Sequence, residues 1–330
     1  IEVRRTASAT CYTHRNYAFR KTMRRIPPYL KRGDTIGLVA PAGYMHFDKM
    51  QTCIEVLNDW GYHVKTGNTI HSHAQNYFSA PDTDRLADLQ DMMDDDTVKA
   101  ILCARGGYGT SRIVDDISFK KFRKSPKWII GFSDITVLHC HLLTQYKIAS
   151  LHAPMAAAFA DGDFDHPYLH SLQAALSGER LEYQAASHPF NKTGRGRGLL
   201  VGGNLALLAH LIGTPSEPRT RGRILFLEDV GEYKYSIDRM LLQLKRAGKL
   251  NNLAGLVIGG FTDVKDTERP FGKDVYEIIN DAVKEFNYPI CFHFPVSHER
   301  DNYVLKVGVA HRFIVTVSGV HWQEWSRLIG

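Results

Sequence analysis

The feature that most constrains the fold of this chain is a repeated alternation of short apolar runs with helical patterns. Three of the runs are wholly or almost wholly apolar, at residues 35–40 (TIGLVA), 98–104 (VKAILCA) and 128–132 (WIIGF). Runs that are apolar on both faces are typical of buried parallel strands. Each is followed by a turn and then by a helical pattern, so the sequence predicts an α/β fold with a doubly wound parallel sheet covered by helices on both faces.

The helices expected after these strands have their own signals. Apolar residues recur at helical spacing between residues 50 and 60, and Gly61 is typical of the residue that follows a helix. A second helix, reaching residue 93, is expected to open at Ser79 with Pro81 just inside it. Further helices are expected at residues 111–117 and 134–145.

A second set of elements follows a stretch of different composition. Residues 161–198 are rich in Asp, Gly, His and Pro and end in a Gly-Arg repeat, so we interpret them as an interdomain linker. We therefore expect an N-terminal nucleophile domain at residues 28–160 and a smaller, β-rich α/β domain at residues 199–330. The strands of the second domain are expected at residues 223–228, 253–259, 290–294, 303–309 and 313–317, and its helices at residues 204–212, 237–246 and 275–286.

The formal charge of +6 is concentrated at the N-terminal end. Residues 1–26 contain seven Lys and Arg and one acidic residue, and the rest of the chain balances 34 basic against 34 acidic side chains. A neutral body does not favour nucleic acid as a partner. We expect residues 1–27 to be a disordered basic tail or to lie upstream of a native start at Met23. No apolar run reaches the roughly 20 residues that span a bilayer, so we expect no membrane partner.

Cysteine and histidine spacings indicate neither disulfides nor a metal site. The five cysteines are odd in number, widely spaced and never CxxC, which is typical of a reducing compartment. The pairs His71/His73 and His139/His141 are two residues apart, which does not place both rings on one helix face. No HExxH motif is present. We therefore expect no metal and no cofactor.

Ser133 is a candidate nucleophile because of where its motif lies. The residues Gly131-Phe132-Ser133-Asp134 stand where a buried strand turns into a helix. A serine there exposes its hydroxyl above the sheet, next to helix N-terminal amides that can stabilise an oxyanion. The alternative is that Ser133 simply caps the following helix.

Residues 105–109 (Arg-Gly-Gly-Tyr-Gly) form a second loop after a buried strand. Glycines let backbone N–H groups approach a ligand closely, which favours an oxyanion- or carboxylate-binding loop. A tight turn that needs positive φ would explain the same residues without a ligand. The spacing matches neither GxGxxG nor a P-loop.

Candidate acid–base residues lie in the second half of the chain. Glu228 ends the strand RILFLE, beside Asp229 and Glu232, where a carboxylate is well placed to orient a histidine. A solvated strand end explains the same cluster equally well. His298, in a polar loop after the strand CFHF, is one of sixteen histidines. Nothing in the spacing decides which carboxylate would face it.

Taken together, these residues resemble the LD-carboxypeptidase family of serine peptidases, which includes muramoyl-tetrapeptide carboxypeptidases and microcin-immunity hydrolases. The resemblance covers about residues 28–320. Its motifs are KRGD (31–34), APAG (40–43), ARGGYG (104–109), GFSD (131–134), GGNL (202–205), LEDVGE (227–232), IDR (237–239), and His298 with Asn302. The family commonly has Gly before this histidine and Leu-Pro-x-Gly downstream, whereas this chain has Ser297 and Leu305-Lys306-Val307-Gly308.

The resemblance implies a flavodoxin-like N-terminal domain followed by the smaller domain, in a cytoplasmic homodimer. It implies a Ser–His–Glu triad in which His298 is the general base for Ser133 and Glu228 orients the histidine. The oxyanion- and substrate-binding residues that it implies are Gly107, Asp134, Arg105 and Tyr108.

Two substrates are open within the family. One is a murein tetrapeptide, which would lose its terminal D-alanine during cell-wall recycling; the other is an aminoacyl-nucleotide amide. The second calls for an aromatic side chain that stacks on the base. Residues 161–198 contain no tryptophan, so we favour the tetrapeptide. The aromatic residues of that segment are Phe164, Tyr168, Tyr183 and Phe190. A non-catalytic protein that binds a small anionic ligand is the alternative from another class, and it would not need Ser, His and Glu together.

Overall fold

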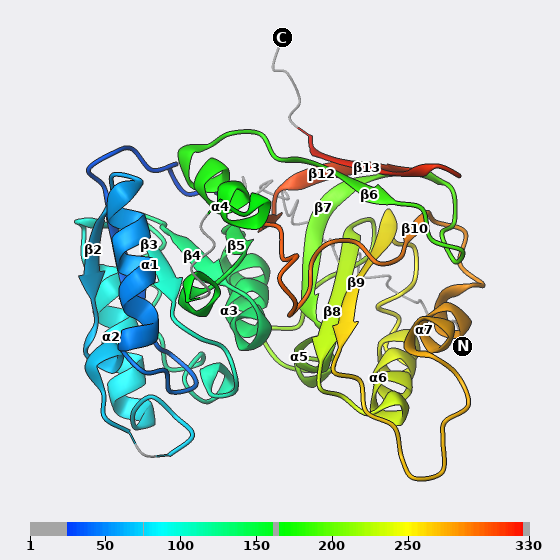
Figure 1. The fold of residues 1–330 in the computed structure, drawn as a ribbon, viewed down its shortest axis with the longest axis horizontal. Helices are drawn as coiled ribbons and strands as arrows, with labels where there is room; N and C mark the ends of the chain where they lie inside the picture. The colour runs from blue at the N-terminus through cyan, green and yellow to red at the C-terminus, as the bar shows by residue number, and fades with distance from the viewer. Residues whose placement is uncertain (1–24, 75, 161–164, 326–330) are drawn as a thin grey trace, which may run out of the picture.

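A computed structural model describes residues 25–74, 76–160 and 165–325. The expected basic tail up to residue 24, with Met23, lies outside these residues. The described chain forms two sheets side by side, each with helices packed against it (Figure 1). The expected α/β fold class is confirmed, but the second sheet also takes in β6 from the segment expected as a linker, and β11, expected in the second domain, joins the first sheet.

The first sheet has six strands in the order β11-β5-β4-β3-β1-β2. The strands β1 to β5 are mutually parallel, and their order 2-1-3-4-5 is the flavodoxin-like order that we expected. The strands are β1 Thr35–Val39, β2 His63–Thr66, β3 Val98–Cys103, β4 Trp128–Gly131, β5 Ser150–His152 and β11 Leu305–Val307. The helices of this part are α1 Asp48–Asp59, α2 Asp82–Asp94 and α3 Thr136–His141, with the short helices η1 Asn68–His71, η2 Thr110–Arg112, η3 Ser133–Ile135, η4 Leu142–Tyr146 and η5 Ala156–Phe159.

Two local expectations for the first part are wrong. Ser79 does not cap α2: its hydroxyl donates to the carbonyl of Ala40 at 2.5 Å, and Pro81 occupies the capping position. The expected helix at 111–117 is only the single turn η2. Ser79 has a residue type that often caps helices, but its hydroxyl binds the chain after β1 instead, so a tertiary contact overrides the local preference.

The second sheet has seven strands in the order β10-β9-β8-β7-β12-β13-β6, parallel from β10 to β7 and antiparallel beyond. The strands are β6 Glu182–Ala186, β7 Gly194–Asn204, β8 Ile224–Val230, β9 Gly255–Thr262, β10 Ile290–Cys291, β12 Ala310–Val315 and β13 Gly319–Glu324. The remaining helices are α4 Pro167–Ser177, α5 Leu205–His210, α6 Lys234–Arg246 and α7 Val275–Val283.

The segment expected as a linker contains regular structure. Residues 165–198 include α4, β6 and the first half of β7, and the Gly-Arg repeat is part of β7. A Cβ on Gly196 would collide with the ring of Phe313 on β12, whereas Arg195 and Arg197 on the other face are exposed. The repeat therefore alternates between a packed face and a solvent face, as a strand does.

The two parts interlock. Strand β11, from the C-terminal part, pairs with β5 and extends the first sheet. Its buried Lys306 forms an ion pair with Glu324 of β13 at 2.7 Å. At the other end of β7, a Cβ on Gly203 would fall 2.5 Å from the hydroxyl of Thr136, which accepts a hydrogen bond from the Asn204 amide at 3.2 Å. This close approach places the carboxyl end of β7 against the start of α3.

None of the helices in the described ranges is long and apolar enough to cross a membrane.

Candidate active site

Ser133 stands directly after β4, at the turn where the chain leaves the first sheet for α3. Its φ is +60°, a left-handed conformation that non-glycine residues rarely adopt. Holding a residue there costs on the order of 1–3 kcal/mol. The capping positions of η3 and α3 are held by Phe132 and Ile135, so Ser133 is not an N-cap. The turn presents the serine at the carboxyl edge of the sheet, as expected for a nucleophile.

The glycine loop after β3 lies against this turn. A Cβ on Gly106 would fall 2.8 Å from the Cβ of Ser133 and 3.4 Å from the amide nitrogen of Asp134. Only glycine fits at this position. Gly107 has a φ of +98°, and its amide has no hydrogen-bond acceptor in the described chain. The loop therefore brings backbone donors close to the serine, which is the geometry of an oxyanion hole.

A buried arginine holds the glycine loop in place. Arg85 of α2 is fully buried, and its guanidinium donates to the carbonyls of Ala80 at 3.2 Å, Gly109 at 3.0 Å and Pro41. It also pairs with Asp82. Because a guanidinium has five donors in a rigid plane, one side chain fixes two loops at the same edge of the sheet.

Glu228 and His298 form a hydrogen-bonded pair. Glu228, fully buried at the carboxyl end of β8, places Oε2 2.7 Å from Nδ1 of His298. The imidazole packs against the ring of Phe132, with ring centroids 4.7 Å apart. Its Nε2 has no hydrogen-bond partner in the described part of the chain. That nitrogen is the one available to a group in the cavity that His298 shares with Ser133.

The other two candidate carboxylates are used differently. Asp229 accepts hydrogen bonds from the side-chain amide of Asn204 at 2.7 Å and from the backbone N–H of Ala206 at 3.0 Å, so it fixes the start of α5. Glu232 makes no hydrogen bond to His298 within the described ranges. The sequence left open which of the three carboxylates faces His298. In the structure, Glu228 is the one whose side chain contacts the histidine.

The environment changes the proton affinities of this group. Burial by itself lowers the pKa of His298, but the hydrogen bond and negative charge of Glu228, with smaller contributions from Asp229 and Asp263, outweigh it and raise the pKa above its ordinary value. Burial, and then the neighbouring charge of Glu228, raise the pKa of Asp229 to about 7. The buried negative charge of Glu228 therefore stabilises an imidazolium at His298.

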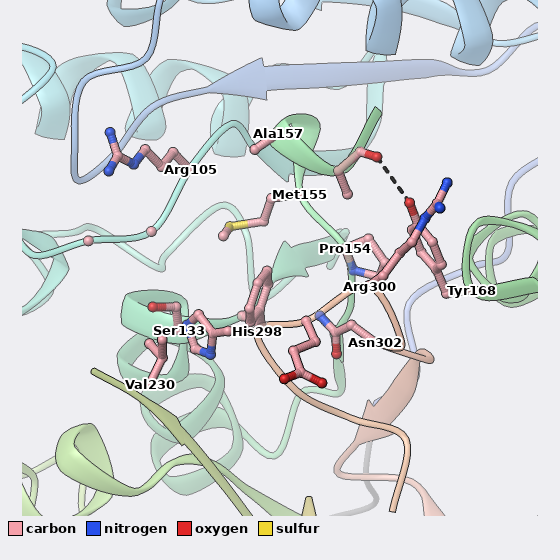
Figure 2. Close-up of a pocket in the computed structure, with 15 residues that line it drawn as sticks. Arg105, Ser133, Pro154, Met155, Ala157, Tyr168, Val230, His298, Arg300 and Asn302 are labelled. Atoms are coloured by element: carbon pink, nitrogen blue, oxygen red, sulfur yellow. Dashed lines mark hydrogen bonds between the residues drawn. The ribbon is translucent and has the colours of Figure 1, made fainter. Parts of the chain in front are cut away.

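Ser133 and His298 line one cavity of about 710 Å³ between the two parts of the molecule (Figure 2). Strand ends of the first sheet and the loop after β10 supply its walls. The lining residues are Arg105, Gly106, Gly107, Phe132, Ser133, Pro154, Met155, Ala157, Ala158, Tyr168, Val230, His298, Glu299, Arg300 and Asn302. The cavity is large enough for a short peptide, and its wall is mostly apolar with a few polar groups, as is common for ligand sites.

Two of the residues implied by the resemblance do not have their side chains in the cavity. Tyr108 is 45% exposed, and its ring packs against Phe78 with centroids 5.9 Å apart. The carboxylate of Asp134 is fully buried and accepts the backbone N–H of Thr110 at 2.8 Å. Only its backbone amide, 3.4 Å from where a Cβ on Gly106 would lie, is near the glycine loop. By contrast, Arg105 lines the cavity and donates to the carbonyl of Tyr44 at 2.9 Å.

Several site residues could not be singled out from the sequence. Phe132 packs on the imidazole, and Tyr168 and Arg300 form part of the wall. Tyr168 comes from α4, inside the segment expected as a linker. Arg85 belongs to no recognisable motif. The only feature that could have singled it out is a charged residue among apolar positions of the expected helix. Asn302 was visible only as part of the family resemblance.

None of the cysteines in the described ranges lines the cavity. The four cysteines in the described ranges are buried and unpaired, and burial raises the pKa of Cys140 and of Cys291 to about 12. Among the described residues, no group of three or more His, Cys, Asp and Glu side chains is placed to hold a metal ion.

A strained serine after a parallel strand, backbone donors beside it and a carboxylate-bound histidine across a cavity define a serine-type hydrolase site. The comparisons with known proteins agree with this class. The family model described as the LD-carboxypeptidase N-terminal domain matches residues 36–153, and that described as the LD-carboxypeptidase C-terminal domain matches residues 197–313. The chain belongs to the LD-carboxypeptidase family and is a serine-type carboxypeptidase. The expected resemblance is confirmed, and the non-catalytic alternative is set aside.

Relatives and solved structures cover most of the chain. A probable murein peptide carboxypeptidase of Bacillus subtilis is 36% identical, over 86% of this chain and 89% of the relative. The murein tetrapeptide carboxypeptidase of Pseudomonas aeruginosa is 28% identical, over 83% and 91%. The crystal structure of muramoyltetrapeptide carboxypeptidase from Oxalobacter formigenes is similar with a TM-score of 0.81 and 30% identity, over 88% and 99%. MccF in complex with glutamyl sulfamoyl guanosine shares the fold at a TM-score of 0.80 and 18% identity, over 91% and 98%.

Proposed function

We propose that this enzyme hydrolyses the L,D-peptide bond that precedes the terminal D-alanine of murein tetrapeptides, with Ser133, His298 and Glu228 as its catalytic triad. The observation that carries the proposal is the 2.7 Å bond between Glu228 and His298, beside a serine held at positive φ in the same cavity. Binding alone would require neither the strained serine nor the buried carboxylate.

The first step is attack of the Ser133 hydroxyl on the carbonyl carbon of the scissile bond. His298 accepts the hydroxyl proton at Nε2 while its Nδ1–H donates to Glu228. The raised pKa of His298 supports this role, because the imidazolium that forms lies beside a buried negative charge. Glu228 holds the ring in the tautomer that leaves Nε2 free to act as a base.

The tetrahedral intermediate carries its negative charge on the former carbonyl oxygen. The amides of Gly107 and Asp134 are the donors proposed to stabilise it. One well-placed donor of this kind contributes about 3–4 kcal/mol in other acyl-transfer enzymes. The imidazolium of His298 then gives its proton to the leaving nitrogen, so D-alanine departs as the amine and an acyl-enzyme ester remains on Ser133.

Water completes the cycle. His298 removes a proton from a water molecule that attacks the acyl carbon, and the second tetrahedral intermediate collapses with return of that proton to the oxygen of Ser133. The products are a tripeptide and D-alanine. Ser133 follows β4 of the first sheet, whereas His298 lies in the loop that joins β10 of the second sheet to β11 of the first. The close approach of Gly203 to Thr136 therefore supports activity by setting the distance between the two parts.

The names of the relatives support a murein peptide as the substrate. The cavity supports it too, because Arg105 and Arg300 in its wall supply positive charge for a carboxylate such as that of a terminal D-alanine. Its apolar side, with Pro154 and Met155, suits the aliphatic part of a short peptide.

The second candidate is an amide between an aminoacyl group and a nucleotide-like compound. The shared fold of MccF and the presence of an aromatic residue, Tyr168, in the cavity wall favour it. Tyr168 is only 2% exposed, however, and its hydroxyl donates to the carbonyl of Ala158 at 3.1 Å (Figure 2). A ring packed in this way offers little surface on which a base could stack, so we keep the tetrapeptide as the first choice.

We further propose that the enzyme works in cell-wall recycling as a cytoplasmic homodimer. The unpaired cysteines of the described chain support a reducing compartment. Light scattering of the purified protein will measure the mass in solution. A mass of one chain at micromolar concentration would remove the dimer from the proposal.

The decisive experiment is release of D-alanine from a purified murein tetrapeptide, followed by mass spectrometry for the wild type and Ser133→Ala. We expect release by the wild type and a loss of about 10⁴-fold or more in the variant, as for removal of a serine nucleophile elsewhere. Absence of release by folded wild type would remove the tetrapeptide and direct the assay to aminoacyl-nucleotide amides. Equal release by both proteins would remove Ser133 from the mechanism.

A further inference from the structure

Asn302 is a buried polar side chain without a partner. It is 4% exposed and lines the cavity that contains Ser133 and His298 (Figure 2). Both its Nδ2 and its Oδ1 lack a hydrogen bond in the described part of the chain. Its backbone is satisfied at the N–H, which donates to the carbonyl of Arg300 at 3.0 Å. Both polar atoms of its side chain therefore lack a partner among the described residues.

Two neighbouring side chains of the same loop make hydrogen bonds within the protein. The hydroxyl of Ser297 accepts the N–H of Glu299 at 2.9 Å, and His298 binds Glu228. Asn302 takes no part in this network. Burying a carboxamide without partners costs free energy of folding, so native proteins rarely retain one unless another molecule completes it.

We propose that the carboxamide of Asn302 binds a second backbone amide of the substrate, on the acyl side of the scissile bond. This inference rests on the proposed peptidase function. A carboxamide has a donor and an acceptor, and a peptide amide offers a C=O and an N–H that satisfy both. A carboxylate offers only acceptors and would leave Oδ1 of Asn302 unpaired, so the amide is the better match.

The position of that amide follows from the reaction. The residue released by a carboxypeptidase ends in a carboxylate and has no amide beyond the scissile bond. The amide bound by Asn302 must therefore belong to the part that is transferred to Ser133. An aminoacyl-nucleotide amide, whose acyl part is a single amino acid, lacks such a group. Asn302 thus favours peptides over aminoacyl conjugates.

The test pairs a substrate change with a side-chain change. The substrates are the tetrapeptide and an analogue in which the amide preceding the scissile one is an ester, so that its N–H is replaced by oxygen. The enzymes are the wild type and Asn302→Leu. We expect the ester to lower kcat/KM of the wild type about 10-fold or more, and that of the variant less than about 3-fold.

Thermal unfolding separates binding from a structural role. Asn302→Leu is expected to keep or raise Tm, because an unpaired buried group is removed. Asn204 is the matched control: its side chain donates to Asp229 at 2.7 Å and accepts the N–H of Leu207 at 3.1 Å, so Asn204→Leu is expected to lower Tm. A fall in Tm for Asn302→Leu as large as that for the control would overturn the proposal, as would failure of the variant to fold.

The outcomes distinguish this inference from the proposed function. If the wild type cleaves the tetrapeptide and the ester affects both enzymes equally, Asn302 does not bind that amide and the function stands. If the wild type cleaves no tetrapeptide, both proposals fail.

Discussion

The two sides of the cavity are built by different means. Beside the first sheet, the site is made from backbone geometry: Ser133 is held at a φ of +60°, and Gly106 leaves room for it. Gly107 adds a backbone amide that donates no hydrogen bond within the described residues. Across the cavity, it is made from side chains: buried Glu228 holds His298 by one hydrogen bond. The first side needs residues that permit an unusual backbone, and the second needs a charge placed in a dry environment.

This difference indicates which substitutions should abolish activity on each side of the cavity. A backbone site fails when a side chain is added, because the surrounding chain has no room to move. An electrostatic site fails when a charge is removed, even if every atom keeps its place. The two sides can therefore be tested separately. On the Glu228–His298 side, a substitution removes charge and keeps the shape; on the Ser133 side, it changes the shape and keeps the charge.

The largest effect is expected for Glu228→Gln, which keeps the shape and removes the charge. We expect kcat to fall about 10³- to 10⁴-fold, in line with the equivalent change in a serine protease triad. The pH dependence also changes. Activity requires neutral His298, so the wild type loses kcat/KM as pH falls through the raised pKa of His298. In the variant, the main contribution that opposes burial is lost, so the pKa of His298 falls and the acidic limb moves to lower pH.

Glu232→Gln is the matched control for that measurement. It removes a neighbouring carboxylate that does not bond to His298 in the described structure. We expect its kcat and its acidic limb to stay close to those of the wild type. An equal fall of kcat in both variants, or an unmoved limb in Glu228→Gln, would contradict the assigned partner.

A smaller loss, about 10- to 100-fold in kcat, is expected for Gly106→Ala on the backbone side. The added Cβ would fall 2.8 Å from the Cβ of Ser133, so the serine or the loop must shift. Gly272→Ala is the control, since its Cβ meets nothing within 4 Å although its φ is +84°. It is expected to lose some stability and no activity. Activity is measured with the tetrapeptide. If folded Gly106→Ala keeps full activity, the loop can move to make room for the added Cβ, and the close fit beside Ser133 is not required.

The smallest effect concerns the strain itself. Ser133→Gly is expected to be more stable than Ser133→Ala by about 1 kcal/mol, because glycine adopts positive φ without a steric penalty. Urea unfolding of the two inactive variants will measure this. Ser236, within α6, gives the reverse order as a control, since alanine stabilises a helix relative to glycine. Equal midpoints for the Ser133 pair would show that the turn stores no strain.

Much of this molecule follows from local patterns. The apolar runs predicted β1, β3, β4 and β8, and the strand–turn–helix position of Ser133 was evident from its motif. The errors are also local. The Gly-Arg repeat had the composition of a linker, but the packing of Phe313 against Gly196 makes it part of β7. Composition could not reveal this, because the deciding partner lies more than a hundred residues away.

The site divides in the same way. The sequence by itself determined the parallel sheet, the nucleophile candidate and the glycine loop, since these depend on alternation, turns and residues close along the chain. Only the tertiary structure decided that Glu228, rather than Asp229 or Glu232, contacts His298. It also decided that Asn302 lines the cavity with no hydrogen-bond partner for its side chain in the described part of the chain. These facts depend on which way a side chain points and what is buried beside it. Both Glu228 and His298 are placed by elements far apart in the sequence, β8 and the loop after β10, so no local pattern encodes their contact.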